Sequence, residues 1–459
     1  NGCAVLNSLY LPDGLTSIAD SAFMACSALS FIDFPSTLTS IGDRTFMGCE
    51  ALSFIDFPGS LTSIGASAFK GCKKLEFIEL PQLLTTVKNS TFAGCTSLYD
   101  IKLNSRLETI EDKAFYSDRS ISREALYIPA SLKSVGRNAF TGSEFKKVVV
   151  SDLSAWCDID FAEGSSNPAS TAFDRLWLNN TRITDLEIPE GVTEVKPYTF
   201  NSLQLKSLKL PNSLKTIGQS AFADNELKEL VIPSKVTSIG DYAFGNHSEK
   251  NIVIPASVNH IGSRAFTPSR GITMESVTIE DGVTEIDIHR SAFYCENIWQ
   301  FVIPETVYLG RHITTLPGGF DERVKDLTLG QIMTEIKAGE FERCYGLTKV
   351  NFGSSINSIG ESAFRNCSNL NTIVLPPSIE TIEDSAFDGC SSLESVVMGC
   401  NIKKVGENAF NGCPAKSVSI TAQTPPSAYK NTFSNYNGTL KLQDPGDKSL
   451  LDAYYEAIL

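Results

Sequence analysis

One phrase recurs along the chain and constrains its fold more than any other feature. ALSFIDFPSTLTSIG at 28–42 returns as ALSFIDFPGSLTSIG at 51–65, and a near copy, KLEFIELPQLLTTVK, begins at Lys74. A marker phenylalanine, usually preceded by alanine, recurs at intervals of 22 to 27 residues, apart from two gaps of 60 and 48 residues. The markers are Phe23, Phe46, Phe69, Phe92, Phe115, Phe140, Phe200, Phe222, Phe244, Phe266, Phe293, Phe341, Phe364, Phe387, Phe410 and Phe433. Irregular units around Phe173 and Phe320 would fill the gaps, giving about eighteen units of roughly 23 residues, a period typical of stacked repeats.

Each unit keeps the same order of apolar and turn residues. In the phrase at 28–42, Ile32 and Phe34 lie two residues apart, which predicts a short strand with these two side chains inside. Pro35 has no N–H to give to a sheet and is expected to end the strand. Gly42 is expected at a corner that needs a permissive backbone. One unit cannot enclose its apolar side alone, so stacking must place equivalent residues on one another and make the core continuous.

The repeated pattern resembles a known family. LPxxLTSIGxxAFxxCxxLxxIxLP fits the opening units and returns in SSINSIGESAFRNCSNLNTIVLPPSIETIEDSAFDGCSSLESVVM at 354–398. It is similar to the BspA-like leucine-rich-repeat proteins, a type first described in treponemes, over nearly the whole chain. The resemblance implies a leucine-rich-repeat solenoid, a right-handed horseshoe or arc with one parallel strand per unit, loops and short turns on the other face, and few helices. It also implies a bacterial or protist surface protein that adheres to host matrix proteins or to other cells.

We expect a single solenoid with local irregularities. The predicted parts are regular repeats at 1–150, an irregular looped repeat at 151–182, further repeats at 183–436 with an irregular unit near 294–340, and a C-terminal cap at 437–459. The cap rests on a turn followed by apolar residues from Leu450 to Ile458 that are spaced like one face of a helix. A dimerisation or partner helix is the alternative for this segment.

The charge and hydropathy of the chain limit which kinds of partner and which membrane segments can be expected. The chain has 39 Lys and Arg against 53 Asp and Glu, a net charge of −14, which disfavours nucleic acid as a partner. No apolar run approaches the ~20 residues of a membrane-spanning helix, so no transmembrane segment is expected. The opening NGCAVLNSLYLP lacks the regions of a signal peptide. The resemblance implies an extracellular or cell-surface protein, so we expect that its targeting segment is absent from this sequence.

The cysteines and histidines do not predict a reactive centre. Stacked cysteines would lie about 4.8 Å apart with parallel Cβ vectors, a poor geometry for disulfides, so buried free thiols are expected. Eight of the twelve cysteines follow a marker by three residues: Cys26, Cys49, Cys72, Cys95, Cys344, Cys367, Cys390 and Cys413. Neither a metal-ligand spacing nor a nucleophile or phosphate-loop motif occurs, and the four histidines are expected at the surface or in turns. The sequence thus predicts no catalytic residues, no metal, no cofactor and no enzyme.

A candidate binding site comes from the side of each strand that faces away from the core. Alternation sends the phenylalanine and the acid of each SFIDF phrase outward. The candidate residues are Phe31, Asp33, Phe54, Asp56, Phe77, Glu79, Asp100 and Lys102. One interpretation is a contact strip for a basic, partly apolar protein segment. The other is that the rings stack along the strand ladder and were copied by duplication.

Three classes of function follow from these features. The first is a non-enzymatic adhesin that recognises host or neighbouring-cell proteins, of the matrix or serum type, through the strand face. The second is a structural or self-assembling spacer. The third is a carbohydrate-binding surface protein, since Phe and Asp on a shallow face would also suit sugars.

Overall fold

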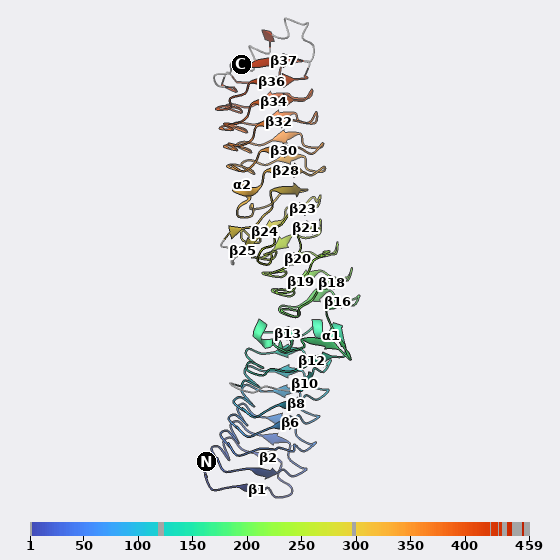
Figure 1. The fold of residues 1–459 in the computed structure, drawn as a ribbon, viewed down its shortest axis with the longest axis vertical. Helices are drawn as coiled ribbons and strands as arrows, with labels where there is room; N and C mark the ends of the chain where they lie inside the picture. Colours follow the sequence, from blue (N-terminus) through green and yellow to red (C-terminus); the bar gives the residue numbers. More distant parts are fainter. Residues whose placement is uncertain are drawn as a thin grey trace. The chain divides into compact units, whose positions relative to one another are not determined.

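The computed structural model describes residues 2–117, 124–295, 300–422, 424–429, 431–433, 438–442 and 452–453. The chain forms two compact units: unit 1 comprises Asn1–Glu229 and Tyr242–His247, and unit 2 comprises Leu230–Asp241 and Ser248–Leu459. Each unit is a stack of short strands in which one repeat makes one coil (Figure 1). The predicted leucine-rich-repeat solenoid, with parallel strands and few helices, is confirmed.

Unit 1 has two rows of strands, one from the apolar phrase and one from the SIG phrase. The first row is β1 (Ser8–Tyr10), β3 (Phe31–Asp33), β6 (Phe77–Glu79), β8 (Asp100–Lys102), β10 (Ala125–Tyr127), β12 (Lys147–Val150), β14 (Leu176–Leu178), β16 (Asp185–Glu187) and β18 (Ser207–Lys209). The second row is β2 (Ser17–Ile18), β4 (Ser40–Ile41), β5 (Ser63–Ile64), β7 (Thr86–Val87), β9 (Thr109–Ile110), β11 (Ser134–Val135), β13 (Asp160–Phe161), β17 (Glu194–Val195) and β19 (Thr216–Ile217). We call the outward side of the first row the strand face.

The segment 151–182 of unit 1 departs from the repeat. It contains α1 (Leu153–Cys157), the 3-10 turns Gly164–Ser166 and Pro168–Ser170, and β15 (Thr181–Arg182), which is antiparallel to β14. Asp152 caps α1 by accepting hydrogen bonds from the main-chain N–H groups of Ser154 and Ala155.

Unit 2 repeats the two-row arrangement. Its first row is β21 (Asn251–Ile254), β23 (Ser276–Ile279), β27 (Thr306–Leu309), β28 (Asp326–Leu329), β30 (Lys349–Asn351), β32 (Thr372–Val374), β34 (Ser395–Met398), β36 (Ser417–Ile420) and β37 (Thr439–Leu442). Its second row is β20 (Ser238–Ile239), β22 (His260–Ile261), β24 (Asp287–Ile288), β29 (Glu335–Ile336), β31 (Ser358–Ile359), β33 (Thr381–Ile382) and β35 (Lys404–Val405). A hairpin of β25 (Tyr294–Cys295) and β26 (Gln300–Phe301) and the short helix α2 (Phe320–Arg323) interrupt the repeat.

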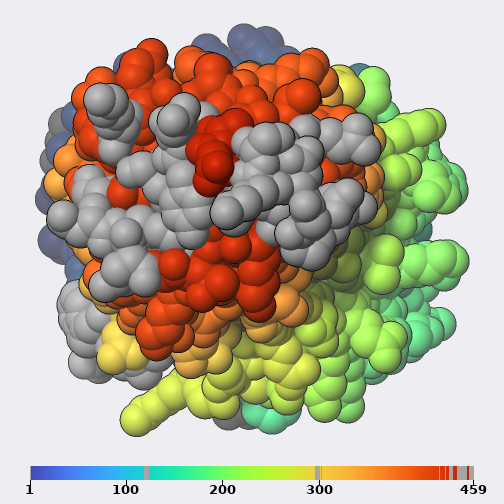
Figure 2. Space-filling model, turned by 90° about the horizontal axis from the view of Figure 1, so that it is seen from above, coloured from blue at the N-terminus to red at the C-terminus, as the bar shows by residue number. Residues whose placement is uncertain are grey.

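The last described strand of unit 2, β37, pairs in parallel with β36 and extends the stack into the range predicted as a cap. Figure 2 looks onto this end, where the last coils are red. The apolar residues from Leu450 to Ile458, on which the predicted cap helix rests, lie almost entirely outside the described residues.

Equivalent side chains lie in register from coil to coil. Ile18 pairs with Ile41, and Ile41 with Ile64, along β2, β4 and β5. The marker rings form a buried column in unit 1, where the centroids of Phe46 and Phe69 are 5.3 Å apart with an interplanar angle of 15°. A second column runs through unit 2 from Phe320, whose ring lies 6.2 Å from the next marker. The predicted continuous core is therefore present in each unit.

Phe173 does not join these columns. Its side chain is 85% exposed, so it does not act as the marker ring of the irregular unit expected around it. Trp156 of α1 is one of the buried rings in this part of unit 1. Its indole N–H donates to the carbonyl of Thr199, and its ring packs against buried Phe161 at 5.2 Å. The helix thus supplies the aromatic group that the repeat lacks here.

The glycine of the SIG phrase is needed for a different reason from the one expected. Gly65 does not have a positive φ; instead, a Cβ built on it would lie 2.4 Å from the main-chain N of Asp43 and the carbonyl carbon of Gly42. The second-row corners of successive coils therefore touch through their backbones. Positive-φ residues instead flank many of the markers, as Ser67 and Gly71 do around Phe69.

The cysteines form the expected buried slot. Cys49, Cys72 and Cys95 are free and buried, and each thiol donates to the carbonyl of the marker phenylalanine one coil earlier, at 3.3 to 3.4 Å. In the unit of marker Phe222, Asn225 takes the position of the cysteine. Its Nδ2 donates to the carbonyl of Phe200 at 2.8 Å. Leu203 and His247 hold the same buried position in two other units, so the slot does not require a thiol.

Burial makes these thiols unreactive. Desolvation raises the pKa of Cys49 and of Cys95 to about 12 and raises the pKa of Cys72 as well. Because the thiolate is the nucleophile, we expect these three cysteines to resist iodoacetamide at pH 8, whereas exposed Cys3 is alkylated. Peptide mass spectrometry of the labelled native protein measures this, and alkylation in urea is the control. Rapid native labelling of Cys72 would contradict the buried column.

Candidate protein-binding face

The first coils of unit 1 expose aromatic rings on the strand face. Tyr10 is 72% exposed, Phe31 44% and Phe54 53%, while the intervening Ile32 and Ile55 are buried. Alternation therefore places Phe31 and Phe54 on the outside as predicted, whereas Tyr10 was not among the predicted residues. We call Tyr10, Phe31, Asp33, Phe54 and Asp56 the N-terminal strip.

The rings of the N-terminal strip do not form a continuous stack. Tyr10 and Phe31 are in contact, with centroids 5.7 Å apart and planes inclined by 50°. Within the described residues, no ring contact links Phe31 to Phe54 or Phe54 to Phe77. Stacking along the ladder therefore does not account for the exposed rings beyond the first pair.

The acids of the N-terminal strip are unpaired. Asp33 and Asp56 are exposed, and neither takes part in an ion pair or a side-chain hydrogen bond in the described part of the chain. Two free carboxylates therefore lie beside the exposed rings.

The third copy of the phrase differs. Phe77 is half-buried, and Lys102 lies over its ring with Nζ 5.0 Å from the centroid. The same ammonium group is 3.7 Å from Glu79, so one lysine engages both the third ring and the third acid. Of the eight predicted residues, the structure leaves four open, Phe31, Asp33, Phe54 and Asp56, and brings Phe77, Glu79 and Lys102 together in a closed group.

The main chain beneath Phe54 is also open. Phe54–Phe57 is not a strand, and among the described residues none of its main-chain N–H or C=O groups bonds to another main-chain group. The sheet is interrupted here, since β3 pairs only with β1 and β6 only with β8. A hollow of about 370 Å³, lined by Phe54, Asp56, Phe77 and Glu79 among others, lies at this break. Unpaired main-chain groups can bond to water or to an extended partner segment.

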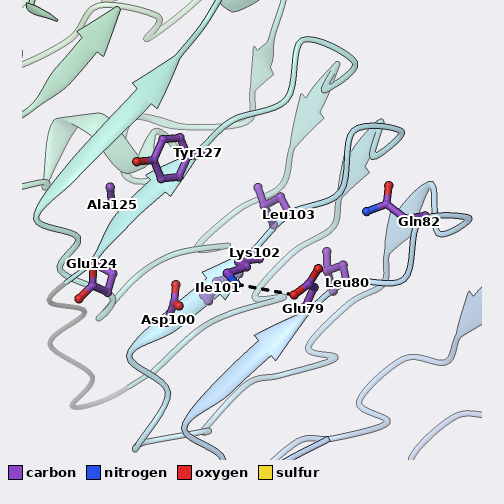
Figure 3. Close-up of a pocket in the computed structure, with 10 residues that line it drawn as sticks. All are labelled: Glu79, Leu80, Gln82, Asp100, Ile101, Lys102, Leu103, Glu124, Ala125 and Tyr127. Carbon is purple, nitrogen blue, oxygen red and sulfur yellow. Dashed lines mark ion pairs between the residues drawn. The ribbon is translucent and has the colours of Figure 1, made fainter. Parts of the chain in front are cut away.

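A second hollow of about 380 Å³ occurs at the next break, where β8 and β10 are not hydrogen-bonded. Figure 3 shows its lining, with Lys102 reaching back to Glu79 while Tyr127 stands on the neighbouring strand. Asp100 lines this hollow, and its pKa is raised, mainly by burial. The eighth predicted residue therefore lines an adjoining depression, which shares Glu79 with the first.

Two exposed rings of this face were not predicted from the sequence. Tyr10 and Tyr127, which are 72% and 63% exposed, stand at the position that the phrase fills with an acid, because Tyr10 pairs in register with Asp33. Alignment of NSLYLP and EALYIP with SFIDFP would have found both.

The histidines and carboxylates form no candidate metal centre. No group of three or more His, Cys, Asp or Glu side chains among the described residues could hold a metal ion. His260 and His289 are exposed and His312 is half-buried, but His247 is only 1% exposed. The prediction of a surface or turn position is wrong for His247, which occupies the buried slot filled by cysteine in other units.

Comparison with known proteins identifies the family. A profile of the BspA type leucine rich repeat region, in six copies, matches residues 1–122, 172–298 and 320–439. No curated protein matches the chain. Nor does any helix within the described ranges have the length and apolarity needed to cross a membrane.

Solved structures of leucine-rich-repeat proteins are similar at low identity. A leucine-rich repeat protein from Bacteroides ovatus is 23% identical, covers 96% of this chain and 85% of its own, and has a TM-score of 0.29. The pneumococcal vaccine antigen PcpA is 19% identical over 85% of this chain and 78% of its own, with a TM-score of 0.33. A leucine rich cell surface protein from Faecalibacterium prausnitzii is 18% identical over 98% of this chain and 90% of its own, with a TM-score of 0.24. Since the family profile covers most of the sequence, this chain belongs to the BspA-type leucine-rich-repeat family.

Proposed function

We propose that this protein is an extracellular, non-enzymatic adhesin that binds proteins of host or neighbouring cells, of the matrix or serum type, through the strand face of unit 1. Leucine-rich-repeat proteins generally act as binding scaffolds, because a stack of coils presents a long surface made of equivalent positions. The observation that carries the proposal is the N-terminal strip, in which exposed Phe31 and Phe54 lie beside the unpaired Asp33 and Asp56.

The strip suits a partner segment that is basic and partly apolar. Aromatic side chains supply most of the binding free energy when a partner removes them from water. Exposed carboxylates attract and orient cationic groups, and this contribution weakens as salt concentration rises. The open main chain of 54–57 adds hydrogen-bonding groups for an extended segment.

The proposal is tested by measuring the affinity of purified matrix and serum proteins for the immobilised full chain. We expect Phe31→Ser/Phe54→Ser to weaken binding at least about tenfold, since two anchoring rings are lost. We expect Asp33→Asn/Asp56→Asn to reduce the salt dependence of the association rate. Both double variants should keep the melting temperature nearly unchanged, because exposed substitutions away from the core usually cost within about 0.5 kcal/mol.

Val374→Ser is the matched control. Val374 is 59% exposed on β32 in unit 2, so its loss removes exposed apolar area from a strand outside the N-terminal strip. Binding should persist in this variant. If the Phe31/Phe54 variant bound as tightly as the unmodified chain but melted at a much lower temperature, the rings would be structural and the proposal would be wrong. Self-association without binding to any panel protein would favour a spacer, and binding to glycans alone would favour a carbohydrate-binding protein.

A further inference from the structure

A cluster of cations surrounds one tryptophan on the strand face of unit 1, outside the N-terminal strip. We propose that this cluster, formed by Lys147, Arg175, Trp177 and Arg182, binds carboxylate groups of an acidic segment in a partner protein. We call it the Trp177 cluster. It is a second site of opposite charge and does not depend on the function proposed for the N-terminal strip.

The fold brings these residues together through strand register. Val148 pairs with Leu176 between β12 and β14, which places Lys147 opposite Arg175. Trp177 pairs with Arg182 across the antiparallel strands β14 and β15. Lys147 reaches over the indole ring, with Nζ 4.1 Å from the centroid. The irregular β15 is thus what adds the second arginine to this face.

Among the residues that the structure describes, the cations of the Trp177 cluster have no acidic partner. Arg175 donates through Nη1 to the carbonyl of Ser170, and Arg182 donates through Nη2 to Oε1 of Gln204 at 2.8 Å. Each guanidinium carries five N–H donors, so most of the Nη donors have no acceptor among the described residues. The Nε atoms of both arginines are buried, and neither has a hydrogen-bond acceptor in the described part of the chain.

This lack of pairing contrasts with the other basic residues on the coils. Lysines elsewhere commonly pair with a glutamate one coil away, as Lys73 does with Glu50 at 2.7 Å and Lys209 with Glu187 at 2.5 Å. Arg175 instead has Arg182 as a charged neighbour, and burial together with this like charge lowers its pKa. An arriving anion would relieve the repulsion between the two guanidinium groups.

The geometry favours a carboxylate on a polypeptide. A guanidinium presents two parallel donors that match the two oxygens of a carboxylate, and such charge-assisted pairs are about twice as strong as neutral ones. Trp and Arg are also the residues enriched at the energetic centres of protein interfaces.

The test uses a blocked peptide of sequence EEFEE, with QQFQQ as the uncharged control, titrated into the full chain by calorimetry and by tryptophan fluorescence. We expect the acidic peptide to bind and the control peptide not to bind. The variant Arg175→Gln/Arg182→Gln should weaken binding at least about tenfold. Lys133→Gln is the matched control for loss of positive charge, since Lys133 lies in the same unit and pairs with Glu108.

Two further variants keep the test decisive. Arg175→Lys/Arg182→Lys retains the charge but removes the paired donors of the guanidinium groups. If these donors hold the carboxylate, the variant should bind the acidic peptide severalfold more weakly. Phe31→Ser/Phe54→Ser should leave the acidic peptide bound as before, which separates this site from the N-terminal strip. Equal binding of EEFEE to the unmodified chain and to both arginine variants would overturn the proposal. A heparin hexasaccharide that binds through the two arginines while EEFEE does not would overturn it as well.

Discussion

Replacing Phe69 by alanine is expected to destabilise unit 1 by about 3–5 kcal/mol, the usual cost of removing a buried phenylalanine. The ring is fully buried and lies between Phe46 and Phe92, with centroids 5.3 and 5.6 Å away. Phe57 also meets it edge-on at 5.6 Å. The substitution therefore leaves a cavity and removes three ring contacts. Because each coil is stabilised by its two neighbours, the loss weakens an interface on either side.

Urea denaturation followed by circular dichroism measures the loss for Phe69→Ala, and hydrogen exchange locates it. The control is Phe54→Ala, which removes an equally large ring that is 53% exposed and should change stability much less. Protection from exchange should fall in the coils around 46–92. A similar loss in both variants would mean that the strand face, and not the buried column, holds unit 1 together.

Much of the fold follows from the sequence because its repeats obey simple spacing rules. The alternation in the phrase at 28–42 predicts that Ile32 is buried, as it is. The 23-residue spacing predicts that Phe23 stacks on Phe46, and their ring centroids lie 5.5 Å apart. Equivalent positions in stacked coils share one environment, so a local prediction repeats along the chain. The same regularity makes the cysteine slot predictable.

The details of the candidate site depend on contacts between coils that the phrase does not encode. Phe77 has the same local sequence pattern as Phe54, but Lys102 from the next coil covers it. The break in the sheet at 54–57 arises from the separation of neighbouring strands, which alternation cannot reveal. The Trp177 cluster depends on the hairpin of β14 and β15 within an irregular segment, where no repeat supplies a register.

The role of the SIG glycine could not be predicted either, because sequence spacing does not show how closely two backbones approach. A permissive φ and a lack of room for Cβ both select glycine. Only the contact of Gly65 with Asp43 and Gly42 distinguishes them, and it shows that the missing side chain matters here. Alanine at Gly65 should therefore lower the stability of unit 1.

Gly65→Ala is expected to destabilise unit 1 by about 2–4 kcal/mol, since overpacking costs about 1–3 kcal/mol and each weakened hydrogen bond about 1 kcal/mol. The added Cβ would lie 2.4 Å from main-chain atoms of the preceding coil, which cannot rotate away. Separating the coils would also stretch two hydrogen bonds, from Gly65 N–H to the carbonyl of Ile41 and from Ala66 N–H to Oδ1 of Asp43, both 2.8 Å. Gly59→Ala is the matched control in the same coil, because a Cβ there meets nothing within 4 Å. Thermal and urea denaturation of the two variants should therefore differ clearly, and equal stability would show that the coils can separate at this corner without cost.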